Sequence, residues 1–289
     1  MLVPLIKSAR PHQWVKNLFV AAPLVFARRI SDVTALGHAA LAVAAFCLLS
    51  SAVYLINDVV DVEKDRAHPV KRHRPIAAGT IPLGLAWTLA PAVALLGLGL
   101  ALVLGTAVVI SAAAYLALNL AYSLGLKKVA FLDVACISLG FLLRVLAGSF
   151  AIPVLPSKWL LVCTLLLSAL LGFGKRTHEL RVSGEGGSAQ RDVLSKYALP
   201  TLQRLMVLLG LLTSVTYLAY TRSAHAQDFF GARPLVLTVP FVAFGVFRFI
   251  WITSRKLDAE SPTDSMLRDW PFMLNLALYG VAILLLVSR

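Results

Sequence analysis

The segment NDVVDVEKD follows a long apolar run and places Asn57, Asp58, Asp61 and Asp65 within nine residues. On an α-helix, with about 100° of rotation per residue, these side chains fall within one arc of about 100°. Carboxylates at such short distances repel one another unless a cation lies among them. If the helix continues past the apolar run, the sequence therefore predicts a cation site formed by Asn57, Asp58, Asp61 and Asp65.

The oxygen ligands of this acidic motif (residues 57–65) suit Mg²⁺, which usually binds one or two carboxylates together with phosphate oxygens of a substrate. We therefore expect the three aspartates to be catalytic and, with Asn57, to hold Mg²⁺ against a diphosphate. The sequence leaves open whether Asp58 binds the metal directly or through water. The alternative is a solvated helix end whose carboxylates pair with Lys64 and Arg66. Ionisable residues near membrane depth are costly and usually functional, which favours the metal site.

Basic side chains follow the acidic motif almost at once. The residue before Pro69 is disfavoured in a helix, so we expect the helix to end there and the chain to turn. The cations that follow can anchor a loop on the inner face of a membrane. They can also neutralise phosphate oxygens that the metal does not reach. Of the basic residues in KRHR (71–74), we take Arg72 and Arg74 as candidates for binding substrate.

The composition of the chain places this motif in a membrane protein. The 289 residues have a mean hydropathy of +0.81 and only 14% of them are charged, too few to cover a water-soluble globule. Apolar windows of about 20 residues, the length that crosses a bilayer, predict an all-α polytopic membrane protein with nine transmembrane helices. The predicted spans are residues 12–28, 36–57, 83–102, 105–124, 129–152, 158–175, 201–221, 234–253 and 271–288.

The distribution of Lys and Arg orients these spans. With the N-terminus in the cytoplasm, the N-terminal segment and the loops after spans two, four, six and eight hold 19 of the 27 basic residues. This asymmetry follows the positive-inside rule. It predicts a multi-pass protein of the plasma (inner) membrane whose acidic motif faces the cytoplasm. Because the membrane accounts for the net charge of +13, we expect no nucleic-acid partner.

The predicted inner loops carry nearly all the residues that are capable of chemistry. We therefore expect one transmembrane domain over residues 1–289, with its active face on the cytoplasmic side. The third inner loop contains VSGEGGSAQRD, residues 182–192. Its Gly and Ser content predicts a mobile segment that could act as a lid.

Several segments carry a family resemblance. NDVVDVEKD matches the NDxxDxxxD signature of the UbiA superfamily of intramembrane prenyltransferases. Five further stretches resemble its branch of 5-phosphoribose-1-diphosphate:polyprenyl-phosphate transferases, namely RPHQWVKN (10–17), HPVKRHRPIAAGTI (68–81), YSLGLKKVAFLDV (122–134), GFLLRVLAG (140–148) and GKRTHEL (174–180). The resemblance runs from about residue 5 to residue 205, and more weakly to the end. It implies a UbiA-type bundle of nine helices, a Mg²⁺ cofactor and a cavity that opens to the cytoplasm.

The chain departs from the prenyl-transferring members of that superfamily after the sixth span. Those members carry a second aspartate-rich motif there, whereas this chain reads KRTHE, with Lys175, Arg176 and Glu179. Two cations in place of carboxylates favour a second anionic substrate. The resemblance thus implies transfer of 5-phosphoribosyl from 5-phosphoribosyl 1-diphosphate to a polyprenyl phosphate of the decaprenyl type. Diphosphate is released, and the product belongs to lipid-linked sugar and cell-wall precursor synthesis.

Further candidates for binding substrate lie inside the predicted spans. Lys16 and Asn17 are polar residues within the apolar first span, which favours a cavity-facing role. Asp133 and Arg144 are eleven residues apart, so they lie on nearly the same side of the fifth helix. About 16 Å of rise separates their backbones, which disfavours a direct ion pair and leaves a substrate role for each.

For the remaining candidates, the sequence offers a structural role as the alternative to substrate binding. Lys127 and Lys128 are either topology anchors or phosphate ligands, and Tyr122 is either an interfacial residue or a hydroxyl donor to the ribose. Lys175 and Glu179 are spaced for mutual neutralisation at i,i+4. The family resemblance favours substrate binding by these two residues and by Arg176.

Two other functions stay open from the sequence. A prenyltransferase that acts on an aromatic acceptor is disfavoured by the missing second aspartate motif. A membrane carrier for phosphorylated solutes would place charges at mid-membrane in both halves of an internal repeat, and the sequence has no convincing repeat. The sequence fixes neither the polyprenyl length, nor the number of metal ions, nor whether the protein is a homo-oligomer in the lipid bilayer.

Overall fold

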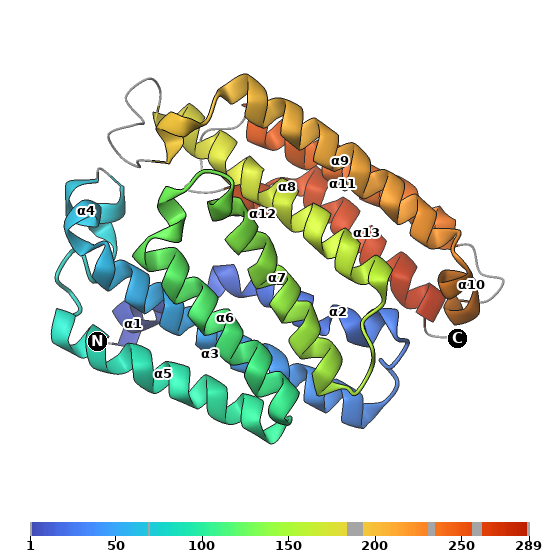
Figure 1. The fold of residues 1–289 in the computed structure, drawn as a ribbon, viewed down its shortest axis with the longest axis horizontal. Coiled ribbons are helices and arrows are strands. Elements are labelled where there is room, and N and C mark those ends of the chain that lie inside the picture. Colours follow the sequence, from blue (N-terminus) through green and yellow to red (C-terminus); the bar gives the residue numbers. More distant parts are fainter. Residues whose placement is uncertain (1, 69, 184–192, 231–234, 256–261, 288–289) are drawn as a thin grey trace. The chain divides into compact units, whose positions relative to one another are not determined.

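The computed structural model describes residues 2–68, 70–183, 193–230, 235–255 and 262–287, and within these its regular structure is all helical (Figure 1). The α-helices are α1 (Leu2–Ala9), α2 (Leu18–Phe26), α3 (Val33–Val60), α4 (Val62–Ala67), α5 (Leu83–Val103), α6 (Thr106–Leu124), α7 (Leu132–Ala151), α8 (Lys158–Ser183), α9 (Leu199–Thr221), α10 (Ala224–Phe230), α11 (Val239–Arg255), α12 (Pro262–Leu267) and α13 (Trp270–Val287). Short 3₁₀ helices are η1 (Pro11–Asn17), η2 (Lys71–His73), η3 (Leu126–Lys128), η5 (Leu194–Lys196) and η6 (Leu235–Thr238). The expected all-α class is confirmed.

The chain divides into two compact units. Unit 1 comprises Met1–Leu126 and Leu143–Pro156, and unit 2 comprises Lys127–Leu142 and Ser157–Arg289. In unit 1, α3 packs against α2 and α5, with Phe46 and Leu49 fully buried. In unit 2, α8 packs against α9 around the buried side chain of Met206. Helix α7 is divided between them, its first part in unit 2 and its second part in unit 1.

Within the described residues, seven helical segments are long and apolar enough to cross a membrane, which makes the chain a multi-pass membrane protein. They are Val33–Val60, Leu83–Val103, Thr106–Leu124, Leu132–Ala151, Lys158–Arg181, Leu199–Thr221 and Leu235–Arg255. Each overlaps one predicted span. The ninth predicted span corresponds to a shorter apolar stretch of α13, Trp270–Leu286.

The first predicted span, residues 12–28, is divided between two helices. It folds as η1 followed by α2, which has only nine residues. Pro23 lies inside α2, where it removes one backbone donor. The buried side chain of Asn17 lies at the junction. Nine helical residues rise about 14 Å, roughly half the thickness of a hydrocarbon core.

Helix α3 carries the acidic motif to the end of a spanning segment. Asp32 caps the start of α3 by accepting a hydrogen bond from the backbone N–H of Ala35 at 3.0 Å. The 28 residues of α3 rise about 42 Å, which exceeds a hydrocarbon core of roughly 30 Å by about two turns. Asn57 and Asp58 can therefore leave the apolar layer while they are still part of the helix.

Gly148 in α7 allows a close approach to α2 within unit 1. A Cβ atom at this position would lie 1.8 Å from the carbonyl oxygen of Val20. We expect Gly148→Ala to push the helices apart and to lower the free energy of unfolding by about 1–3 kcal/mol, measured as a lower unfolding temperature in detergent. Gly99→Ala in α5 is the matched control, because nothing lies within 4 Å of an added Cβ there. Equal losses in the two variants would contradict this close contact.

Candidate active site

The acidic motif spans a local interruption of the helix. Helix α3 ends at Val60 and α4 begins at Val62, with Asp61 between them at φ −96° and ψ 11°. The hydrogen-bond pattern of a helix nevertheless continues, since the Asp61 N–H donates to the Asn57 carbonyl at 2.9 Å. The Asp65 N–H donates in turn to the Asp61 carbonyl at 2.8 Å. The motif is therefore bent at Asp61, but its residues stay close in space.

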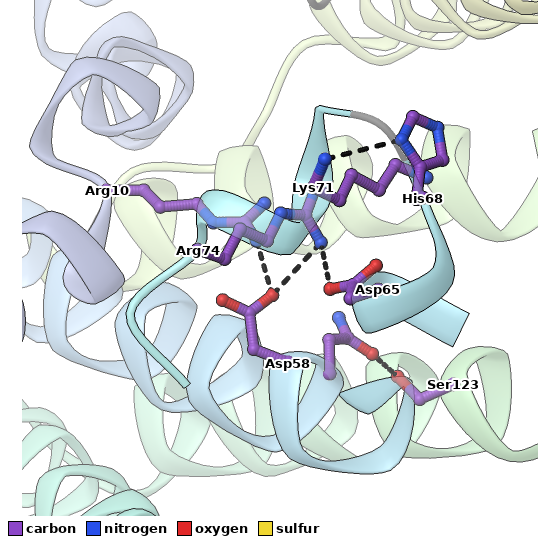
Figure 2. Close-up of polar contacts among 8 residues, drawn as sticks. Arg10, Asp58, Asp65, His68, Lys71, Arg74 and Ser123 are labelled. Atoms are coloured by element: carbon purple, nitrogen blue, oxygen red, sulfur yellow. Dashed lines mark hydrogen bonds and ion pairs between the residues drawn. The ribbon is translucent and has the colours of Figure 1, made fainter. Parts of the chain in front are cut away.

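Two aspartates of the motif share one guanidinium group. Nη1 of Arg74 lies 3.3 Å from Oδ1 of Asp58 and 2.7 Å from Oδ2 of Asp65 (Figure 2). The side chains of Asp58 and Asp65 are only 2% and 5% exposed. Because a buried carboxylate is costly unless it is paired, these contacts stabilise both as anions. The carboxylates of α3 and α4 thus converge on one cationic group.

Arg10 supplies a second cation to the same site. It follows α1, and its guanidinium group forms an ion pair with Asp58 (Figure 2). The same group stacks over the ring of Tyr54, 4.9 Å from the centroid, which holds it in place. Arg10 is absent from the candidates that the sequence predicts. Its position at the head of the RPHQWVKN stretch was the available signal.

The neighbouring candidates of the acidic motif are placed differently. Asn57 accepts a hydrogen bond from the hydroxyl of Ser123, which ties the end of α3 to the end of α6 (Figure 2). The side chain of Arg72 is exposed, and its Nε lies 3.3 Å from Nε2 of His73. The structure therefore places Arg74, and not Arg72, on the carboxylates.

A second polar cluster of unit 1 is buried among apolar helices. Nε of Arg144 donates to Oδ1 of Asn17 at 2.9 Å, and Nη2 donates to the hydroxyl of Tyr115 at 2.8 Å. The amide of Asn17 donates to Ser50 at 3.2 Å. Arg144 is 7% exposed and Asn17 is 0% exposed. These two predicted site residues therefore contact each other, and they link α7 to η1.

A third cluster lies in unit 2 at the start of α7. Oδ2 of Asp133 lies 3.0 Å from Nε of Arg176, and both side chains are fully buried. Nη1 of Arg176 also forms an ion pair with Glu179. A guanidinium group between two carboxylates, one of them fully buried, joins α8 to α7. This arrangement suits a structural role better than direct contact with a solvated phosphate.

Tyr197 completes the third cluster. Its hydroxyl donates to Oδ1 of Asp133 at 2.7 Å and accepts from the backbone N–H of Phe131 at 2.6 Å. Burial, followed by the hydrogen bond to Asp133, raises the pKa of Tyr197 above the usual value of a phenol. The neutral hydroxyl thereby fixes the segment that follows Lys127 and Lys128. No pattern in the sequence singled out Tyr197.

The family of the chain follows from its sequence as a whole. Residues 18–179, more than half of its length, match the model of the UbiA prenyltransferase family. The chain belongs to this family. It is 35% identical to a decaprenyl-phosphate phosphoribosyltransferase from Mycobacterium tuberculosis over 278 residues, which cover 93% of this chain and 89% of that protein. A Corynebacterium glutamicum protein of the same name is 35% identical over 291 residues, covering 95% and 86%.

The fold agrees with that of a solved UbiA structure. A UbiA homologue from Archaeoglobus fulgidus, solved bound to GPP and Mg²⁺, matches 99% of this chain and 100% of its own. The TM-score is 0.73 at 20% sequence identity. The chain therefore has the UbiA fold, and the family that the sequence motifs indicated is confirmed.

The donor set of this UbiA protein fits a hard cation. Among the described residues, no group of three or more His, Cys, Asp or Glu side chains is arranged to hold a metal ion. Asp58 and Asp65 nevertheless direct one oxygen each toward the same nitrogen of Arg74, so both already face one positive centre. Carboxylate oxygens are the ligands that Mg²⁺ prefers. The residues present therefore fit Mg²⁺ once the guanidinium group has moved away.

The other predicted site residues lie at the surface or partly below it. The side chains of Lys16, Asp61, Tyr122, Lys127 and Lys175 are half-buried, and that of Lys128 is exposed. Residues 184–192, most of the expected lid, lie outside the described part of the chain. The candidates thus form an acidic cluster and a buried arginine cluster in unit 1, and an ion-paired cluster in unit 2.

Proposed function

We propose that this UbiA protein transfers the 5-phosphoribosyl group from 5-phosphoribosyl 1-diphosphate to a polyprenyl phosphate and releases diphosphate. The observation that carries the proposal is the 35% identity to decaprenyl-phosphate phosphoribosyltransferases over most of both chains. The segment KRTHE supports it, because it carries no aspartate where a prenyl diphosphate site would have a second aspartate motif, and it places the half-buried Lys175 there. A lipid phosphate is an anion that this cation can bind.

Within this proposal the acidic motif binds the diphosphate end of the donor. Asp58, Asp61, Asp65 and Asn57 are the ligands that would hold Mg²⁺, which when bound stabilises the negative charge of the departing diphosphate. Arg74 lies beside two of these carboxylates and is placed to donate to diphosphate oxygens. The acceptor needs no general base, because a phosphate monoester is already anionic at neutral pH.

The remaining candidates are assigned by their surroundings. Lys127, Lys128 and Lys175 are accessible cations for the phosphate of the acceptor, and Tyr122 and Lys16 are half-buried polar groups for the donor. Arg72 is exposed, and we assign it to bind the donor from the outer side of the site. The buried residues Asn17, Asp133, Arg144 and Arg176 act by holding helices in place. The partly exposed Glu179 supports them through its ion pair with Arg176.

The membrane topology is part of the same proposal. We assign nine spans, with η1 and α2 together as the first and α13 as the last beside the seven long ones, and a cytoplasmic N-terminus. The excess of Lys and Arg on one set of loops supports an active site that faces the cytoplasm at the inner membrane. Residues 1–289 would then act as one functional domain, with homo-oligomerisation left to experiment.

A donor swap tests the proposal directly. The purified protein in detergent or bilayers receives labelled 5-phosphoribosyl 1-diphosphate with decaprenyl phosphate, or labelled prenyl diphosphate with 4-hydroxybenzoate. We expect label in the lipid phase from the first pair only, abolished by EDTA and strongly reduced in Asp61→Asn. Prenylation of the aromatic acceptor would overturn the proposed substrates and keep the metal site. No product from either pair, with intact folding, would overturn the proposed reaction.

A further inference from the structure

Arg10 and Arg74 occupy two of the carboxylate oxygens by which the acidic motif would bind a metal. Arg74 contacts Oδ1 of Asp58 and Oδ2 of Asp65, and Arg10 contacts the same Oδ1 of Asp58. Both arginine side chains are partly exposed, at 21% for Arg10 and 28% for Arg74, whereas the carboxylates are buried. The cations therefore sit at the accessible side of the carboxylates (Figure 2).

The charges of the two buried carboxylates, Asp58 and Asp65, are balanced by Arg10 and Arg74 without a metal. Two carboxylates and two guanidinium groups sum to zero, so a divalent cation that enters alone meets two positive groups within contact distance of its ligands. The repulsion between such close charges is modest in water and grows as the site is buried and the effective dielectric constant falls. The N–H groups also occupy lone pairs that a metal would need. Free metal is therefore expected to bind weakly.

A diphosphate reverses this balance. Guanidinium groups bind phosphate oxygens strongly and often through two parallel hydrogen bonds. If the arginines turn from the carboxylates to a diphosphate, the carboxylate oxygens become available to a cation. The negative charge of the diphosphate then offsets the positive charge of the arginines and of the metal together.

We propose that Arg10 and Arg74 exchange partners when the donor binds, from the carboxylates of Asp58 and Asp65 to the diphosphate. The metal and the diphosphate then enter the site as one unit, and neither binds well without the other. Arg10 thereby becomes a positioning residue of the reaction although it lies 48 residues before Asp58. The inference rests on the proposed function only in taking a diphosphate as the ligand.

Partner exchange has a signature of two opposite effects. In Arg10→Gln and Arg74→Gln, Mn²⁺ alone should bind about tenfold more tightly or better, because one competing charge is gone. Binding of radiolabelled inorganic diphosphate with Mg²⁺ should weaken by about tenfold, because one phosphate ligand is gone. Electron paramagnetic resonance of free Mn²⁺ measures the first effect, and equilibrium binding of the label measures the second.

Arg66→Gln is the matched control. Arg66 is adjacent to Asp65 in sequence, but it pairs with the exposed side chain of Glu63. Its removal subtracts the same charge, and both affinities should stay within about twofold of the wild-type values. A loss of diphosphate binding without a gain in Mn²⁺ binding would show Arg10 and Arg74 to be ordinary phosphate ligands and overturn the exchange. Unchanged affinities would overturn it as well.

Two further measurements keep the test decisive if a glutamine variant folds poorly. Arg10→Lys retains the charge, so it should bind Mn²⁺ as weakly as the wild type does, and tight binding by this variant would contradict the proposal. The unfolding temperature of Arg10→Gln should rise with Mn²⁺, since the metal replaces a missing cation. Because the probes contain neither sugar nor lipid, these outcomes do not depend on whether the donor swap succeeds.

Discussion

Asp58→Asn is expected to lower the rate of phosphoribosyl transfer by about 10²–10³-fold, the cost of losing one electrostatic contact to developing charge. The change keeps the size of the side chain and removes its charge. In the structure Asp58 is 2% exposed and lies against both Arg10 and Arg74. Without its charge, two cations remain with one buried carboxylate, and a metal ligand is lost. Initial rates of label transfer into the lipid phase, with Mg²⁺ varied, measure the effect.

Glu63→Gln is the control for this prediction. Glu63 lies within the acidic motif, but its side chain is 79% exposed and pairs with Arg66. An exposed pair of this kind contributes little, so the rate should stay within about twofold of the wild type. An Asp58→Asn variant with full activity and an unchanged requirement for Mg²⁺ would remove Asp58 from the catalytic site. The metal would then have to be held by the other ligands of the motif, Asn57, Asp61 and Asp65.

The acidic motif was predictable because its information is local. Asn57 and the three aspartates lie within nine residues at the end of an apolar run, and their spacing specifies one helical face, whatever the rest of the fold does. The structure keeps Asp58 and Asp65 together even though the helix is interrupted at Asp61. The spans were predictable for the same reason, since length and hydropathy are properties of single segments.

The partners of the motif were not predictable, because they come from distant parts of the chain. Arg10 reaches Asp58 across 48 residues, and no spacing rule connects the two. The first span was also predicted incompletely. Its apolar composition suggested one helix over residues 12–28, but Pro23 and the buried polar contacts of Asn17 divide it into η1 and α2.

Arg176 has a different environment in the structure from the one that its position in the sequence suggested. From sequence it follows the sixth span, beside Lys175, and suggests a phosphate ligand. In the structure it is fully buried and joins Asp133, which lies 43 positions earlier in the sequence, to Glu179. The spacing of Lys175 and Glu179 suggested mutual neutralisation, whereas the ion pair that Glu179 forms is with Arg176 at i,i+3. The sequence could not show this because α7 and α8 meet only in the folded chain.

A second large effect, on stability, is expected when the buried pair of Asp133 and Arg176 is broken. Asp133→Asn and Arg176→Met should each lower the free energy of unfolding by about 3–5 kcal/mol. The first leaves the buried Arg176 with only the partly exposed Glu179, and the second leaves the buried Asp133 without its cation. The double variant Asp133→Asn/Arg176→Met removes both charges and should recover most of that loss. Unfolding of the four proteins in detergent, combined as a double-mutant cycle, gives the coupling energy between the two side chains.

The Glu179→Gln variant tests whether an ion pair to Arg176 that is not buried contributes less to stability than the buried pair does. Glu179 contacts the same guanidinium group as Asp133, but its side chain is 24% exposed and retains access to water. Its replacement should therefore lower stability by less than about 1 kcal/mol. If Asp133→Asn instead kept the stability of the wild type and lost only activity, Asp133 would bind substrate, as the sequence alone suggested. A loss of stability that the double variant restores, with activity, would assign Asp133 and Arg176 to holding α7 against α8.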